Sequence, residues 1–344
     1  MHPTLLAAPG PGPIASQLHR SGYAVDILEP ALAELIAASL CEATAFFDAI
    51  DDLPGAVRET LCRRQADGRA ALFSGFRMPG EEYAQTYERP DMMQSFSIMA
   101  ADAGRLPAEV WGFLREHPYT RRLFTIREAI IARATAAVAE LAGLLGATGP
   151  LDIDLSSHTF LQVNSYRPNL FEQRYRRPGQ TPLDQRQFLQ DPHEDGQFLT
   201  WAAADDWGLV GRPRGHASGE LAAVEPSPAQ MLVMPSLPFT YYTGGPEHGG
   251  VPPFEHAVLR EYRGRPITAR TSLICFVNPD VTRELPALVP SRENAGLSIP
   301  LLVNEAQWRF GLPRYEDSER VPADEDTRRR TVALLDRLYG NGQR

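Results

Sequence analysis

The stretch DPHEDGQFLTW, residues 191–201, contains residues from which both the fold and the chemistry can be inferred. His193 and Asp195 are two positions apart, so an extended strand carries both side chains on one face. A neutral imidazole beside a carboxylate provides two adjacent ligands for a divalent metal ion. The tripeptide alone also fits a helix cap or a surface pair, so its interpretation as a metal site depends on a third ligand farther along the chain.

We expect the third ligand and an anion site in FEHAVLREYRGRPITARTSLICFVNP, residues 254–279. This segment contains His256, followed by a strand in which Arg270 and Ser272 share a face. An inward-facing arginine in an apolar strand is costly unless it meets an anion, and its guanidinium fork suits a carboxylate. Two histidines and one carboxylate form the facial triad of non-haem iron(II) oxygenases. A 2-oxo acid that takes two open metal positions needs its far end held, and one position then remains for dioxygen.

Rival residues for both roles lie in the same part of the chain. His248, in GGPEHGG, competes with His256 as the third ligand because it follows the run FTYYT, which we expect to be a strand. We favour His256, since the glycines around His248 predict a loop. Arg263 and Arg265 compete with Arg270, but the glycine and proline beside them predict a turn that faces solvent.

A third segment, HTFLQVNSY (residues 158–166), predicts a strand with one polar face. Gln162, Asn164 and Tyr166 fall on that face, while apolar residues alternate with them. A polar interior face implies an occupied cavity. The alternative is that these side chains only satisfy neighbouring backbone groups.

Recurring short apolar runs and turn residues after Pro150 predict a β-barrel or sandwich. Before Pro150, a strand is expected at SGYAVDIL, and helices at 30–50, 108–116 and 120–145. We expect residues 66–99 to be dominated by loops and the first 15 residues to be loose or extended. A last helix is expected around residues 324–339.

The sequence resembles the isopenicillin N synthase-like branch of the iron(II)/2-oxoglutarate-dependent dioxygenases. The resemblance is carried, in this order along the chain, by the motifs NSY, HED followed by GQFLTW, DWGL, HAV, and RTS before FVNP. The SGY strand and a helix ending in AFFD extend the resemblance over residues 16–285. Departures are Ala257 where the family has an arginine, Pro235 and Ser236 in place of a Gly-Asp pair, and longer intervals on both sides of His256.

The resemblance implies a mainly β protein with helical additions, built on a double-stranded β-helix (jelly-roll) core with an N-terminal helical layer. It implies iron(II) as the metal, 2-oxoglutarate as co-substrate, and dioxygen. The ligands would be His193, Asp195 and His256, and the co-substrate would be bound by Arg270, Ser272, Asn164 and Tyr166. We expect one catalytic domain over 1–344, with an N-terminal helical and loop part (1–150), the jelly-roll core (151–285), and a C-terminal extension and helix (286–344).

The expected reaction is hydroxylation, desaturation or cyclisation of a small organic molecule in secondary metabolism, because halogenating relatives have a small residue in place of Asp195. Alternatives are an oxidase of the same branch that does not use 2-oxoglutarate, and a non-catalytic metal-binding jelly roll. The formal charge of −9 argues against nucleic-acid binding. Three cysteines without metal-ligand spacing predict a reducing compartment. No run reaches the roughly 18 apolar residues of a membrane span, so we expect a cytoplasmic protein; the oligomeric state is open.

Overall fold

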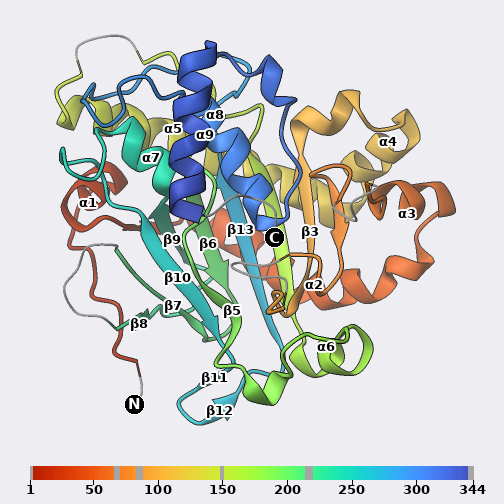
Figure 1. The fold of residues 1–344 in the computed structure, drawn as a ribbon. Coiled ribbons are helices and arrows are strands. Elements are labelled where there is room, and N and C mark those ends of the chain that lie inside the picture. The colour runs from red at the N-terminus through yellow and green to blue at the C-terminus, as the bar shows by residue number, and fades with distance from the viewer. Residues whose placement is uncertain (1–2, 66–69, 83–87, 148–150, 214–219, 340–344) are drawn as a thin grey trace.

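Two antiparallel β-sheets form the core of the computed structural model, which describes residues 3–65, 70–82, 88–147, 151–213 and 220–339. The strands are β1 (Ala24–Ile27), β2 (Gly75–Arg77), β3 (Met93–Met99), β4 (Phe160–Tyr166), β5 (Phe188–His193), β6 (Leu199–Ala204), β7 (Leu209–Pro213), β8 (Ala222–Ala223), β9 (Gln230–Pro235), β10 (Phe254–Leu259), β11 (Glu261–Tyr262), β12 (Arg265–Pro266) and β13 (Arg270–Val277). The larger sheet has the order β1-β9-β6-β13-β4-β3-β2, and the smaller has the order β5-β10-β7-β8. The smaller sheet lies in front of the larger one in Figure 1.

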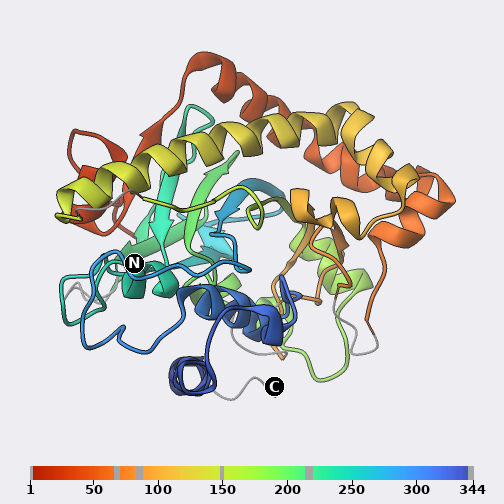
Figure 2. The same ribbon diagram turned by 90° about the horizontal axis from the view of Figure 1, so that it is seen from above.

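The helices are α1 (Ile14–Ser21), α2 (Pro30–Asp48), α3 (Gly55–Leu61), α4 (Ala108–Glu116), α5 (Pro118–Leu144), α6 (Pro168–Arg174), α7 (Leu237–Tyr242), α8 (Ile299–Ala306) and α9 (Glu325–Tyr339). Two helices, α2 and α5, cover the side of the larger sheet that faces away from the smaller one, and α8 and α9 lie on the opposite side of the molecule (Figure 2). Figure 2 shows α2 and α5 running side by side, and both contact β4 and β13. The predicted mainly β core with an N-terminal helical layer is therefore confirmed.

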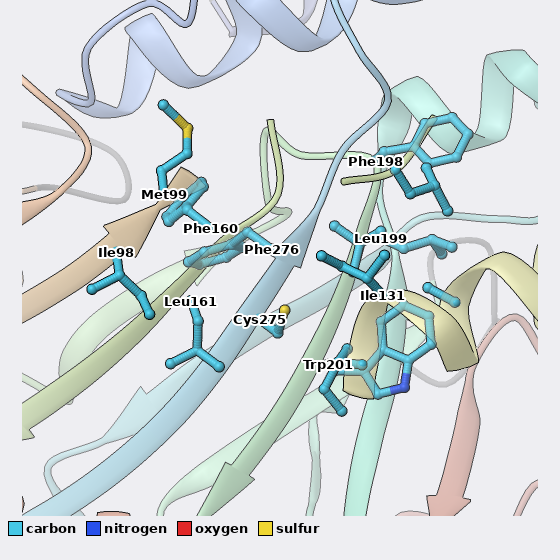
Figure 3. Packing of buried hydrophobic residues seen from close by; sticks show 14 of the residues in the cluster. Ile98, Met99, Ile131, Phe160, Leu161, Phe198, Leu199, Trp201, Cys275 and Phe276 are labelled. Carbon is cyan, nitrogen blue, oxygen red and sulfur yellow. The ribbon is translucent and has the colours of Figure 1, made fainter. Parts of the chain in front are cut away.

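The two faces of the central strands have different roles. Leu161 and Cys275 point toward the helices, and Figure 3 shows them in the same layer as Trp201 and Ile131 of α5. On the opposite face of β4 and β13, polar side chains line a cavity between the sheets. The period-2 alternation of a strand thus separates a hydrophobic core from a polar site.

Residues 66–99, expected to be mainly loop, contribute two strands to the larger sheet. All seven residues of β3 are buried, and β3 pairs with β4 along its whole length. Phe96 and Ile98 join the hydrophobic core, while Ser95 and Ser97 point the other way and bond to buried charged groups. The alternation of serine with apolar residues was the signal for this strand, and the Gly- and Pro-rich context obscured it. The division of the chain at residue 150 stays a prediction.

The run FTYYT, expected to be a strand, lies mainly in helix α7. The prediction was wrong because all six residues of α7 are buried, so no amphipathic period distinguishes a helix from a strand. Pro238 lies in the first turn of this helix, a position that favours helix initiation. The helix is followed by Gly244 and Gly245, both at positive φ, so His248 lies in a loop.

Judged by length and composition alone, the helical segment Pro30–Asp52 is long enough and apolar enough to cross a membrane. In the fold this segment contains α2, whose apolar residues Ile36, Leu40 and Phe47 belong to the main hydrophobic core. Its apolar surface therefore packs against α5 and the sheet.

Candidate metal and co-substrate site

The three predicted metal ligands come together at the inner face of the smaller sheet. His193 at the end of β5 lies opposite His256 in β10, and their ring centroids are 4.3 Å apart. Asp195 follows β5, and its Oδ1 lies 3.7 Å from Nε2 of each histidine. One ligand atom from each residue lies within 4.8 Å of the others, so a single ion can contact all three.

Hydrogen bonds orient the ligand atoms toward this common point. Nδ1 of His193 lies 2.8 Å from the carbonyl oxygen of Asp191, which places the proton on Nδ1 and leaves the Nε2 lone pair for a metal. Thr200 Oγ1 donates to Asp195 Oδ2 over 2.6 Å, and Oδ1 faces the histidines. Burial, followed by the neighbouring His256, lowers the pKa of His193 and keeps its imidazole neutral. Two imidazoles and a carboxylate on one side of the site fit iron(II).

A cavity of about 660 Å³ adjoins these ligands, and all four predicted co-substrate residues line it. Arg270 is 3 % exposed and Ser272 is 4 % exposed. Arg270 Nε donates to the carbonyl oxygen of Asp206 over 3.3 Å. Arg270 Nη1 and Ser272 Oγ have no hydrogen-bond partner among the described residues. Burial lowers the pKa of Arg270, and no described carboxylate forms an ion pair with it. These two unused donors fit a carboxylate ligand.

A chain of side-chain hydrogen bonds along the cavity floor was not anticipated from the sequence. It begins at the buried guanidinium of Arg77 and ends at the buried carboxylate of Asp91. The bonds run from Arg77 Nη2 to Gln162 Oε1 (2.6 Å) and from Gln162 Nε2 to Asn164 Oδ1 (2.8 Å), and then from Tyr166 OH to Gln190 Oε1 (3.1 Å) and from Gln190 Nε2 to Asp91 Oδ2 (2.9 Å). Asn164 and Tyr166 lie side by side on one face of β4 and join the two pairs of bonds. Every donor points in the same direction along this chain.

The chain fixes which atoms of Asn164 and Tyr166 face a ligand. Gln162 donates to the amide oxygen of Asn164, so its amide nitrogen points onward to Tyr166. Arg77 is held in turn by Glu82, with Nε donating to Oε1 over 2.7 Å. Burial raises the pKa of Asp91 to about 6. The sequence contained a signal for part of this arrangement, since Gln162, Asn164 and Tyr166 alternate with apolar residues and so fall on one polar face of β4.

Replacing Gln162 with methionine should break this chain while leaving the volume of the side chain nearly unchanged. The Asn164 oxygen would lose a donor in a buried position, which should lower the free energy of unfolding by about 1–3 kcal/mol. Affinity for a co-substrate beside Asn164 should fall as well. Urea unfolding and calorimetric titration with 2-oxoglutarate measure the two effects. Gln187→Met, at an exposed position, is the control, and its free energy of unfolding should stay within about 0.5 kcal/mol of the wild-type value. Equal stability of the two variants would contradict a structural role for the chain.

The structure separates the rival residues from the site. His248 contacts Glu293 through Nδ1 at 2.9 Å and accepts from Arg292 at Nε2, so both ring nitrogens are engaged elsewhere. Arg263 has a φ of 51° in the turn between β11 and β12, and its guanidinium lies over the rings of Trp207 and Tyr262. The turn predicted for this segment is confirmed.

The described parts of segment 73–96, residues 73–82 and 88–96, are largely internal. Phe76 packs in the hydrophobic core, and Arg77 is 2 % exposed. Tyr83 lies outside the described residues. Among these residues, Arg77 and Glu82 therefore contribute to the floor of the cavity through hydrogen bonds, whereas Phe76 stabilises the layer beneath it.

Comparison with solved structures connects this arrangement with known proteins, whereas no family model and no curated protein sequence matches the chain. The dioxygenase for auxin oxidation 1 from Arabidopsis thaliana, solved with 2-oxoglutarate, has a TM-score of 0.55 and 16% identity, covering 83% of this chain and 96% of that one. A full-length Neurospora crassa protein, solved in complex with alpha-KG and thymine, has a TM-score of 0.54 and 15% identity, covering 93% and 90%.

A protein from Caulobacter crescentus described as belonging to the 2OG-Fe(II) oxygenase family has a TM-score of 0.53 and 17% identity, covering 93% of this chain and 92% of its own. At these identities the likeness concerns the fold, and it does not distinguish the isopenicillin N synthase-like branch from others. The chain thus has the jelly-roll fold of the 2-oxoglutarate- and iron(II)-dependent oxygenases and carries a His-Asp-His triad in its central cavity.

Proposed function

We propose that the protein is an iron(II)- and 2-oxoglutarate-dependent dioxygenase that oxidises a small organic molecule. The observation that supports this most directly is the presence of two complementary sites in one cavity. The triad offers three ligand atoms within 4.8 Å, and the same cavity contains the unused donors of Arg270 and Ser272. A dicarboxylic 2-oxo acid has the two ends that such a pair of sites requires.

In this proposal His193, Asp195 and His256 hold the metal. Arg270 and Ser272 bind the far carboxylate of 2-oxoglutarate, and Asn164 and Tyr166 contact the co-substrate along its length. When bound, iron(II) supplies redox chemistry with dioxygen that is coupled to decarboxylation of 2-oxoglutarate. The protein orients 2-oxoglutarate because it holds the co-substrate at both ends. The surrounding cavity limits access of water to the site.

The proposed reaction is hydroxylation, desaturation or cyclisation of the substrate. We also propose a role in secondary metabolism and a cytoplasmic location. These finer assignments follow from the sequence resemblance. Neighbours of the same fold include the Neurospora crassa protein, which was solved with thymine, and this supports a small-molecule substrate.

The proposal predicts that the purified protein consumes dioxygen only when iron(II) and 2-oxoglutarate are both present, even without its own substrate when ascorbate supplies the two electrons that the substrate would otherwise give. Succinate should form in proportion to the oxygen consumed, because decarboxylation and oxygen reduction are coupled. An oxygen electrode and chromatographic analysis of succinate give the two readings. Oxygen uptake without succinate would favour the oxidase alternative, and no uptake at full iron loading would favour a non-catalytic metal-binding protein.

A further inference from the structure

The cavity continues past the metal ligands as an apolar compartment that the proposed co-substrate does not need. Its walls are largely apolar side chains from both sheets and from the N-terminal segment, residues 3–13. The main contributors are Leu6, Tyr23, Leu209, Val224, Leu232 and Met234. They form a hydrophobic cluster separate from the main core beneath the helices, so they are available to a ligand.

One row of side chains across the larger sheet forms the floor of this compartment. In register, Ile274 of β13 pairs with Ala202 of β6, Ala202 pairs with Leu232 of β9, and Leu232 pairs with Val25 of β1. All four line the cavity. Three strand spacings of roughly 4.8 Å give the row a length of about 14 Å. Such a floor is longer than a single aromatic ring.

The row passes near the metal ligands at Ala202, its second member. Thr200, which donates to Asp195, is two residues before Ala202 on β6 and therefore lies on the same face. Met234 pairs with Thr200 on the neighbouring strand β9. A molecule lying along the apolar row thus passes, at Ala202, two residues from the threonine that bonds to the carboxylate ligand of the triad, and extends from there toward β1.

The N-terminal segment closes the far side of this compartment, and hydrogen bonds tie it to both sheets. Leu6 N donates to the carbonyl of Ala223 in β8 over 2.8 Å, and Ala223 N donates to Thr4 over 2.6 Å. On the other side, side chains next to β1 or in α1 donate to main-chain carbonyls of the segment: Tyr23 to Ala7, Ser21 to Pro9 (3.2 Å), Arg20 to Pro11 (2.8 Å) and Gln17 to Gly12 (2.7 Å). Of the two states expected for the N-terminus, loose or extended, residues 3–13 therefore match the extended one, held in place by these hydrogen bonds.

Charge restricts what this compartment can accept. Of the described residues that line the cavity, Arg270 is the one arginine, and the proposed function assigns it to 2-oxoglutarate. The acidic residues that line the cavity are Glu82, Asp91, Asp195, Asp206 and Glu225. Glu225 directly follows Val224 of the apolar cluster. A second carboxylate or phosphate would therefore meet no cation there and would lie near like charges, which is unfavourable.

We propose that the substrate is an uncharged molecule with a mainly apolar scaffold, bound along the row from Ile274 to Val25 and covered by the N-terminal segment at Leu6. This inference rests on the proposed function in one respect, namely that the end of the substrate that reacts faces the triad. The binding compartment itself does not depend on turnover.

The test uses two probes with one scaffold, neutral 1-naphthalenemethanol and anionic 1-naphthoate, titrated without oxygen into the protein loaded with manganese(II) and 2-oxoglutarate. We expect the neutral probe to bind at least about tenfold more tightly than the anionic one. Leu6→Asp should weaken binding of the neutral probe about ten- to a hundredfold, since the substitution removes an apolar contact of the size of a leucine side chain and adds a charge. The matched control is Leu5→Asp, because Leu5 is 53% exposed and is not part of the cavity wall; it should bind like the wild type.

Leu6→Asn, similar in volume to leucine and uncharged, is measured beside the aspartate variant so that a folding defect cannot account for the loss. Circular dichroism of both variants should match that of the wild type. Equal affinity for the two probes, or unchanged binding of the neutral probe by both Leu6 variants, would overturn the inference. A protein that binds the neutral probe selectively but shows no iron-dependent oxygen uptake would retain this inference and refute the proposed function.

Discussion

Alanine in place of His193, Asp195 or His256 is expected to abolish stoichiometric iron(II) binding while leaving the fold intact. Each residue supplies one of the three ligand atoms that lie within 4.8 Å of one another. Changing a residue that only orients a ligand typically weakens metal binding 10- to 100-fold, so loss of a ligand should cost about a hundredfold or more. None of the three side chains belongs to a hydrophobic cluster, and circular dichroism should change little.

Anaerobic calorimetric titration with iron(II) measures this effect, and metal content after gel filtration provides an independent reading. His248→Ala is the matched control, because it removes an imidazole that contacts Glu293 in a loop. This control should bind one iron per chain, as the wild type does. Full iron binding by the His256 variant would show that the distal ligand has been assigned wrongly.

Lysine in place of Arg270 is expected to weaken 2-oxoglutarate binding about ten- to a hundredfold without changing the affinity for iron. Lysine keeps the positive charge but lacks the planar fork that can bind both oxygens of a carboxylate. Loss of one hydrogen bond to a charged group costs roughly 1.5–3 kcal/mol, which corresponds to the stated change in affinity. The guanidinium is buried and Nη1 has no partner among the described residues, so solvent screens the interaction little.

Titration of iron-loaded protein with 2-oxoglutarate under anaerobic conditions gives the affinity. Arg265→Lys is the control, since Arg265 is an exposed residue of the β11–β12 turn and does not line the cavity. It should bind 2-oxoglutarate as the wild type does. If Arg270→Lys retained wild-type affinity, or if product formed at full rate without 2-oxoglutarate and without succinate, Arg270 would not be the co-substrate anchor.

The sequence was sufficient to predict the parts of the site that follow from local periodicity. His193 and Asp195 are two residues apart, as are Arg270 and Ser272, and each pair shares a face wherever its backbone is extended. The structure places all four around one cavity. The prediction of His256 over His248 also relied on local features, namely an apolar run after one histidine and glycines around the other.

Features that depend on contacts between distant segments were not predictable in this way. Strand β3 pairs with β4 across more than sixty residues of sequence, and Arg77 bonds to Gln162 with a separation of 85 positions. The helix α7 was mistaken for a strand because uniform burial removes the amphipathic signal. The N-terminal segment was expected to be loose or extended because its composition is rich in proline and glycine, and composition alone did not show that its carbonyls are held by side chains that follow it in sequence.

The inner bonds of the hydrogen-bond network from Arg77 to Asp91 could be reversed without changing their number, whereas the two end bonds could not. A reversed chain would have each amide turned over and the tyrosine hydroxyl rotated. The guanidinium at one end can only donate and an ionised carboxylate at the other can only accept, so the two directions differ in energy. The arrangement is therefore chosen before any ligand arrives. A co-substrate that binds beside Asn164 and Tyr166 need not select one orientation from a mixture, and more of the interaction energy remains as affinity.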